Sequence, residues 1–125
     1  RRLPERITEP DRTWFALAAY NNGMGHLEDA RRLTQGLGLD PDLWMDVRDT
    51  LPKLEDERWN TRTRYGHARG SEAVHYVHRV RTYHDMLGRV VEAGAGSRDL
   101  AAVAIRYEPA NRYAHTMSRI VHQLL

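Results

Sequence analysis

Apolar residues recur at helical spacings along most of the chain, and the alternation typical of β-strands is scarce. The first strong segment, residues 11–20, is apolar on nearly all sides, which predicts a buried helix; its apolar members are Trp14, Phe15, Leu17, Ala18 and Ala19. Thr8 or Asp11 is expected to cap its N-terminus. Asn21-Asn22-Gly23 is expected to end it, because Asn and Gly tolerate the left-handed conformation common at helix C-termini.

Two further helices are predicted next. One covers residues 25–35 and ends at Gly36-Leu37-Gly38. The chain restarts at Asp40-Pro41, and the following helix places Leu43, Trp44 and Val47 on one apolar face before Leu51-Pro52 stops it. Residues 53–70 are polar and predicted to be irregular, with Trp59 and Tyr65 as anchoring aromatic residues.

The longest predicted helix covers residues 71–91. Its apolar positions recur three and four residues apart, as on a helix that faces a core: Ala73, Tyr76, Val80, Tyr83, Leu87 and Val90. A small, flexible linker is expected at residues 93–97, followed by short helices at 99–105 and 111–125. The chain is therefore predicted to be all-α, with a compact part at 1–92 and a linker and helical tail at 93–125.

Composition narrows the class of protein. The 125 residues suit one domain, and 41% hydrophobic with 29% charged residues is typical of a soluble globular protein. No window approaches the roughly 18 to 20 apolar residues of a transmembrane helix. The chain opens without Met and without a cationic segment followed by an apolar one, so we expect no signal peptide and a processed product or part of a longer protein. Without cysteine, disulfides and thiol catalysis are excluded.

The charge of the chain excludes few classes of function. The net charge is +2 and the pI about 9.2, and acids alternate with arginines in residues 28–32 and 55–58, as on solvated helix faces. Arg79, Arg81 and Arg89 are interpreted in the same way, with weak attraction to an anionic polymer as the alternative. Helical nucleic-acid binding fits the pI, but no recognition-helix pattern supports it.

Two histidine pairs have spacings compatible with metal ligands: His75 with His78, and His115 with His122. No cysteine or clear carboxylate partner accompanies them, so surface histidines are the preferred interpretation. No metal and no cofactor are predicted.

Three segments carry a family resemblance. Trp14-Phe15-Ala16-Leu17-Ala18-Ala19-Tyr20-Asn21-Asn22-Gly23 resembles the Ala-Tyr-Asn-x-Gly motif of the lysozyme-like lytic transglycosylases, which cut bacterial peptidoglycan. Residues 42–54 are similar to the segment that follows this motif in the membrane-bound transglycosylase F branch. Residues 65–77, Tyr65-Gly66-His67-Ala68-Arg69-Gly70-Ser71-Glu72-Ala73-Val74-His75-Tyr76-Val77, resemble that branch's Tyr-Ala-Arg-Gly-x-Glu-Ala segment, with His67 at its tyrosine position. Three motifs in register are far more specific than one.

The resemblance implies the C-terminal half of a lysozyme-like catalytic domain in a periplasmic, outer-membrane-associated parent. The family's catalytic glutamate lies in a Glu-Ser motif followed by a Gly-Leu-Met-Gln-like element, and neither motif occurs in this sequence. The implied reaction breaks the bond between N-acetylmuramic acid and N-acetylglucosamine. One glutamic acid protonates the leaving oxygen and then deprotonates the muramyl C6 hydroxyl, which attacks C1, closes a 1,6-anhydro ring and consumes no water. The substrate's own groups replace the second carboxylate of ordinary glycosidases.

The resemblance makes Tyr20 and Asn21 the best candidates for contact with the glycan. The alternatives are a core tyrosine and a C-capping asparagine. Glu72 and Tyr76 are four residues apart and share a helix face. Glu72 is either a groove residue or a carboxylate favoured by the helix dipole, and Tyr76 is more simply a core residue. Tyr65 either stacks on a sugar ring or anchors its loop.

Two accounts of the chain remain open. As part of an enzyme it would supply the rear of a glycan groove and would be inactive alone, with exposed apolar surface that dimerisation or the missing half would cover. As a non-catalytic helical module it would bind glycan or a protein partner through a closed, self-sufficient core.

Overall fold

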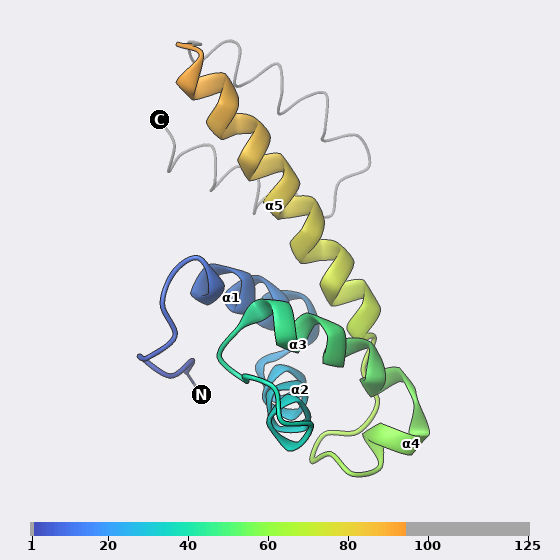
Figure 1. Ribbon diagram of the computed structural model, residues 1–125. Coiled ribbons are helices and arrows are strands. Elements are labelled where there is room, and N and C mark those ends of the chain that lie inside the picture. Colours follow the sequence, from blue (N-terminus) through green and yellow to red (C-terminus); the bar gives the residue numbers. More distant parts are fainter. Residues whose placement is uncertain (1, 95–125) are drawn as a thin grey trace. The chain divides into compact units, whose positions relative to one another are not determined.

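The computed structural model describes residues 2–94. Its elements, in chain order, are α1 (Asp11–Asn22), α2 (Met24–Gly36), α3 (Trp44–Thr50), the 3₁₀ helix η1 (Leu51–Glu55), α4 (Glu57–Asn60) and α5 (Gly70–Glu92) (Figure 1). No strand occurs in this part of the chain, which confirms the all-α fold class. The predicted helices at 99–105 and 111–125, and the linker after residue 94, lie outside the described residues.

The chain divides into two compact units, Arg1–Val77 and His78–Leu125, with the boundary inside α5. In the first unit, α1 packs on α2 and α3, α2 packs on α3 and η1, and α3 and α4 both contact η1. The predicted division at residue 92 stays a prediction.

The core of the first unit is built mainly from the apolar faces of these helices. Phe15 is fully buried, and its ring meets the ring of Trp44 edge to face, with centroids 5.8 Å apart. The other buried apolar residues of α1 to η1 are Trp14, Ala18, Leu27, Ala30, Val47, Leu51 and Leu54. The predicted burial of residues 11–20 is confirmed at Trp14, Phe15 and Ala18, whereas Leu17 and Ala19 are only half-buried.

The predicted cap of α1 is wrong. Neither Thr8 nor Asp11 caps the helix; instead the Glu9 carboxylate accepts a hydrogen bond from the Thr13 N–H at 3.2 Å. The Asp11 carboxylate accepts from the backbone N–H of Trp44 at 2.9 Å, at the first residue of α3. Asp11 therefore satisfies a free N–H at the start of a helix 33 residues away.

The connection between α2 and α3 also departs from the prediction. Leu43 is 44% exposed, so it does not share the buried face of Trp44 and Val47. Residues 53–70 are more regular than expected, because η1 continues through Pro52 to Glu55 and α4 follows it. Proline near the start of a helical segment is compatible with helical geometry, because no N–H of its own is needed there.

Gly70 permits a very close approach between two backbones. A Cβ placed on Gly70 would lie 1.8 Å from the carbonyl oxygen of Leu51, far inside van der Waals contact. The first residue of α5 therefore lies directly against η1, and no side chain fits between them. This is the physical requirement for glycine in the Ala-Arg-Gly segment.

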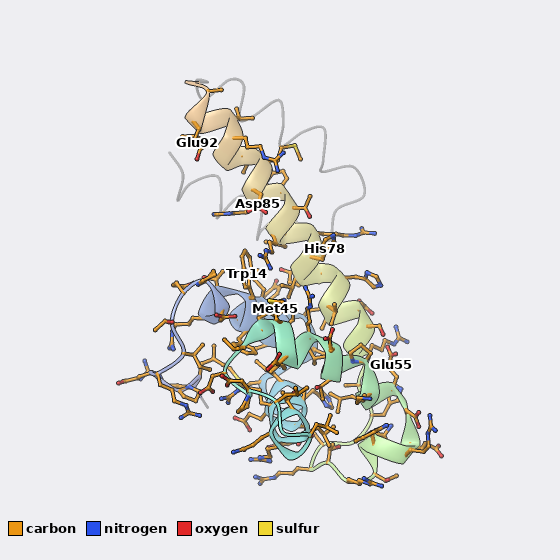
Figure 2. All side chains as sticks on the ribbon, in the orientation of Figure 1. Trp14, Met45, Glu55, His78, Asp85 and Glu92 are labelled. Atoms are coloured by element: carbon orange, nitrogen blue, oxygen red, sulfur yellow. The ribbon has the colours of Figure 1, made fainter. Side chains whose placement is uncertain are left out.

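Glu55 secures the same junction with hydrogen bonds. Its carboxylate accepts from the Ser71 backbone N–H at 3.3 Å and from the Ser71 hydroxyl at 2.9 Å. Figure 2 labels Glu55 where η1 meets the start of α5. A carboxylate at this position satisfies a helix N–H and interacts favourably with the helix dipole.

The apolar stripe predicted on the longest helix is confirmed except at its end. Residues 73, 76, 80, 83 and 87 are all buried, whereas Val90 is half-buried. Val77 is buried as well.

Asp42 connects the N-terminal segment with α2. Its carboxylate accepts from the Arg6 Nε at 2.6 Å and from the Arg31 Nη2 at 2.6 Å, and Arg31 also donates to the Pro41 carbonyl at 2.9 Å. The hydrogen bond from Arg6, supported by Arg31, lowers the pKa of Asp42 below its usual value of 3.8.

Gly70→Ala is expected to destabilise the fold by about 3 kcal/mol or more, because neither backbone at the contact can move away without disturbing the core. Chemical denaturation followed by circular dichroism measures this. The matched control is Gly36→Ala, where an added Cβ has no atom within 4 Å. There we expect a change within about 1 kcal/mol, in the stabilising direction. Equal stabilities for the two variants would contradict the close approach.

Asp42→Asn is expected to lower stability by about 1 kcal/mol near neutral pH, since one partner, Arg6, is largely exposed. Because the folded-state pKa of Asp42 lies below its unfolded value, this stabilisation is complete above that value of 3.8. It disappears as the pH falls through the lower folded-state pKa. Urea unfolding across the acid range should show the two proteins converging there. Asp49→Asn is the control: its carboxylate is 77% exposed, and its ion pair with Arg48 at 3.7 Å contributes little at such a surface position, so this variant should track the parent protein at every pH.

Candidate functional site

Two of the candidate residues form a stacked aromatic pair. Tyr20, near the end of α1, lies with its ring centroid 6.2 Å from that of Tyr76 in α5, and the ring planes differ by 29°. Tyr76 is 1% exposed, whereas Tyr20 is 69% exposed. The buried ring therefore supports one side of Tyr20, and the rest of that side chain faces solvent. The pair joins the first and third of the motif segments, although Tyr20 and Tyr76 are more than fifty residues apart in sequence.

Asn21 follows Tyr20 inside α1 and is half-buried. It does not cap the helix. Gly23 holds the C-cap position with φ of 94°, and its N–H donates to the Ala19 carbonyl at 2.8 Å. The predicted end of the helix at Asn21-Asn22-Gly23 is confirmed, with Gly23 as the residue that adopts the positive φ, whereas Asn21 and Asn22 keep helical geometry.

Glu72 lies in the first turn of α5, one turn before Tyr76. Its carboxylate is 4.0 Å from the Arg69 guanidinium, and its side chain is 31% exposed. This position suits the helix dipole and leaves part of the side chain accessible. A structural role and a groove role for Glu72 are both compatible with this geometry.

Tyr65 lies against α2. Its ring meets His26 edge to face at 6.2 Å, and its backbone N–H donates to Asp29 at 2.9 Å. The aromatic contacts thus pair Tyr65 with α2 and Tyr20 with α5. The hydrogen bond to Asp29 supports the loop-anchoring role of Tyr65, and a contact between Tyr65 and a sugar ring stays a prediction.

Asp29 is the residue that sequence reasoning missed. The charge pattern of residues 28–32 predicts a solvated face, but Asp29 is 1% exposed. Its two carboxylate oxygens accept from the backbone N–H groups of Arg64 and Tyr65, at 3.2 and 2.9 Å. A buried carboxylate needs such partners, because desolvation without them is costly. The sequence signal for this burial is the position of Asp29. It lies one helical turn after Gly25, on the face of α2 that is buried.

Within residues 2–94, no three His, Cys, Asp or Glu side chains are grouped so as to hold a metal ion. His75 and His78 are exposed, and His115 and His122 lie beyond the described part of the chain. No helix among the described residues has the length and apolar character needed to cross a membrane.

No protein-family profile matches the chain. Curated proteins, in contrast, do match this chain. It is 59% identical over 96 residues to a membrane-bound lytic murein transglycosylase F of Marinobacter nauticus, covering 77% of this chain and 19% of that protein. It is 62% identical over 90 residues to the Ectopseudomonas mendocina protein of the same name, covering 72% and 18%, and 56% identical over 99 residues to that of Stutzerimonas stutzeri, covering 79% and 20%.

Over most of its described length, this all-helical segment is therefore similar to part of proteins that are named lytic transglycosylases. More specifically, the chain is homologous to part of membrane-bound lytic murein transglycosylase F, which confirms the family resemblance. It spans about a fifth of the length of the curated relatives it matches.

Substitutions should show that Tyr20 and Tyr76 contribute differently to the stability of the fold. Tyr76→Ala is expected to cost about 3–5 kcal/mol, because it removes a fully buried ring. Tyr20→Ala should cost about 1 kcal/mol or less, since it removes only the stacking contact of an exposed ring. Urea unfolding of both variants measures the difference. A large loss of stability from Tyr20→Ala would show that its ring is a structural part of the core.

Proposed function

We propose that this chain forms the rear part of the glycan groove of a peptidoglycan lytic transglycosylase. The observation that carries the proposal is the stacking of Tyr20 on Tyr76, which unites two motif segments of a chain 55–62% identical to transglycosylase F proteins. An exposed tyrosine held on a buried one is a rigid aromatic surface, and such surfaces suit the faces of sugar rings.

The proposed reaction of the parent protein is cleavage of the N-acetylmuramic acid to N-acetylglucosamine bond. A glutamic acid protonates the leaving oxygen as the C1–O bond breaks. The same carboxylate takes the proton of the muramyl C6 hydroxyl as its oxygen bonds to C1, so that a 1,6-anhydro ring closes without water. We propose that this acid lies on a preceding segment of the parent, because the Glu-Ser motif is absent from this sequence.

The roles assigned to this chain are binding and orientation. Tyr20 presents a hydroxyl and an aromatic face at the end of a well-packed helix, and Asn21 adds an amide beside it. Glu72 and Tyr76 share one face of α5: Tyr76 supports Tyr20, and we assign Glu72 to a sugar hydroxyl. Groups held by a rigid scaffold lose little conformational entropy when substrate binds.

Exposed apolar side chains support the view that further chain packs on this segment. Leu37, Leu39, Leu43 and Met45 are each between 44 and 63% exposed, and all four lie in residues 37–45 (Met45 is labelled in Figure 2). Surfaces of this kind are commonly covered by a partner or by another part of the same protein. We infer a periplasmic, membrane-associated parent from the membrane-bound character in the relatives' name.

The test is digestion of purified peptidoglycan, with mass spectrometry of the released products. The 125-residue chain is compared with a version extended upstream through the Glu-Ser motif of its parent. We expect anhydromuropeptides from the extended version alone. Release by the 125-residue chain itself would show that a carboxylate within it, Glu72 first, acts as the acid.

In the extended version, Tyr20→Phe should lower release about tenfold, as expected for one lost hydrogen bond of about 1.4 kcal/mol. Arg48→Gln, on the outer part of α3, is the matched control and should leave release unchanged. If no version releases anhydro products but the chain still binds glycan strands, the non-catalytic binding module is the correct account.

A further inference from the structure

A cleft of about 480 Å³ lies between α2 and the loop that follows α4. Its lining residues are Asp29, Arg32, Leu33, Arg62, Thr63 and Arg64. This volume is in the range of sites that bind small molecules. None of the five candidate glycan-binding residues lines it.

The cleft has an excess of positive charge. Three of its residues are arginines, and the one acid is Asp29, whose two oxygens already accept the backbone N–H groups of Arg64 and Tyr65. Arg32 is 3.9 Å from that carboxylate and largely exposed. Among the described residues, no carboxylate pairs with the Arg62 or Arg64 guanidinium. Arg62 and Arg64 therefore bring positive charge to the cleft without a paired carboxylate.

Aromatic rings position these two guanidinium groups. Arg62 lies 5.6 Å from the centroid of the Trp59 ring, and Arg64 lies 5.5 Å from that of Tyr65. A cation–π contact orients a guanidinium without neutralising it, and its N–H donors remain available at the edge of the plane. The Asp29 bonds fix the backbone that carries Arg64. The cleft is thus organised before any ligand arrives.

We propose that this cleft is an anion-binding site that takes the carboxylate or phosphate group of a small ligand, with Arg62 and Arg64 as the principal donors and Arg32 at the rim. Guanidinium groups bind both kinds of anion through paired N–H donors. Leu33 supplies an apolar wall for the carbon atoms of the ligand. The proposal does not depend on glycan cleavage, because binding alone is its readout.

The experiment titrates the ¹⁵N-labelled chain with three probes and follows amide chemical shifts by NMR. The probes are the dipeptide Glu-Glu with blocked ends, its neutral counterpart Gln-Gln, and inorganic phosphate. We expect Glu-Glu to shift the amides of residues 62–65 and of Asp29, and Gln-Gln to bind at least about tenfold more weakly. Phosphate binding stronger than Glu-Glu binding would assign the site to phosphate-bearing ligands, and the reverse order to acidic peptides.

Variants test the assigned donors. Replacing both Arg62 and Arg64 by Gln should reduce Glu-Glu affinity about tenfold or more, while R62K with R64K, which keeps the charges, should retain part of it. Arg48→Gln, outside the cleft, should have no effect. Equal binding of Glu-Glu and Gln-Gln to the unaltered chain would overturn the proposal, as would shifts located away from α2 and residues 62–65. The comparison of Glu-Glu with Gln-Gln uses only the unaltered chain, so its result does not depend on whether the variants fold.

Discussion

The described fold depends on the contact between Gly70 and the backbone of Leu51. It brings the start of α5 against η1, and the Glu55–Ser71 hydrogen bonds and the bond from the Ala68 N–H to the Leu54 carbonyl, at 3.2 Å, lie around it. Tyr76 stands less than two turns further along α5. A displaced first turn would therefore move the ring on which Tyr20 stacks, so the candidate Tyr20–Tyr76 pair depends on a glycine that lies outside it.

Local periodicity predicted the elements well, because burial on one helix face leaves a direct trace in sequence. The stripe on α5 and the buried positions Trp14, Phe15 and Ala18 are examples. The failures at Asp11 and Asp29 involve partners that are distant along the chain. Asp11 bonds a residue 33 positions away, and Asp29 bonds residues 35 and 36 positions away. No spacing rule within a helix contains that information. For the site, the motifs identified Tyr20 and Tyr76 separately, but their stacking required the tertiary structure.

Two aspartates show different ways of using a carboxylate in this small protein. Asp42 is partly exposed and joins two arginines, so its contribution depends on charge and varies with pH. Asp29 is buried and accepts backbone N–H groups, so it fixes the course of the chain. Asp42 links two segments through the side chains of two arginines, and other residues could replace such side chains in part. Asp29 is a geometric requirement, since a shorter or uncharged side chain would leave two N–H groups with weaker partners.

The loop after α4 keeps its shape without the side chains of Arg62 and Arg64. Asp29 binds main-chain groups, the Thr63 hydroxyl donates to the Asn60 carbonyl at 2.6 Å, and the Asn60 amide donates to Leu54. The side chains of Arg62 and Arg64 take no part in these bonds. Shape and charge are consequently separate properties here. In evolution, related proteins could exchange residues at these two positions and acquire a different ligand preference while keeping the same loop, much as antibody loops vary on a constant framework.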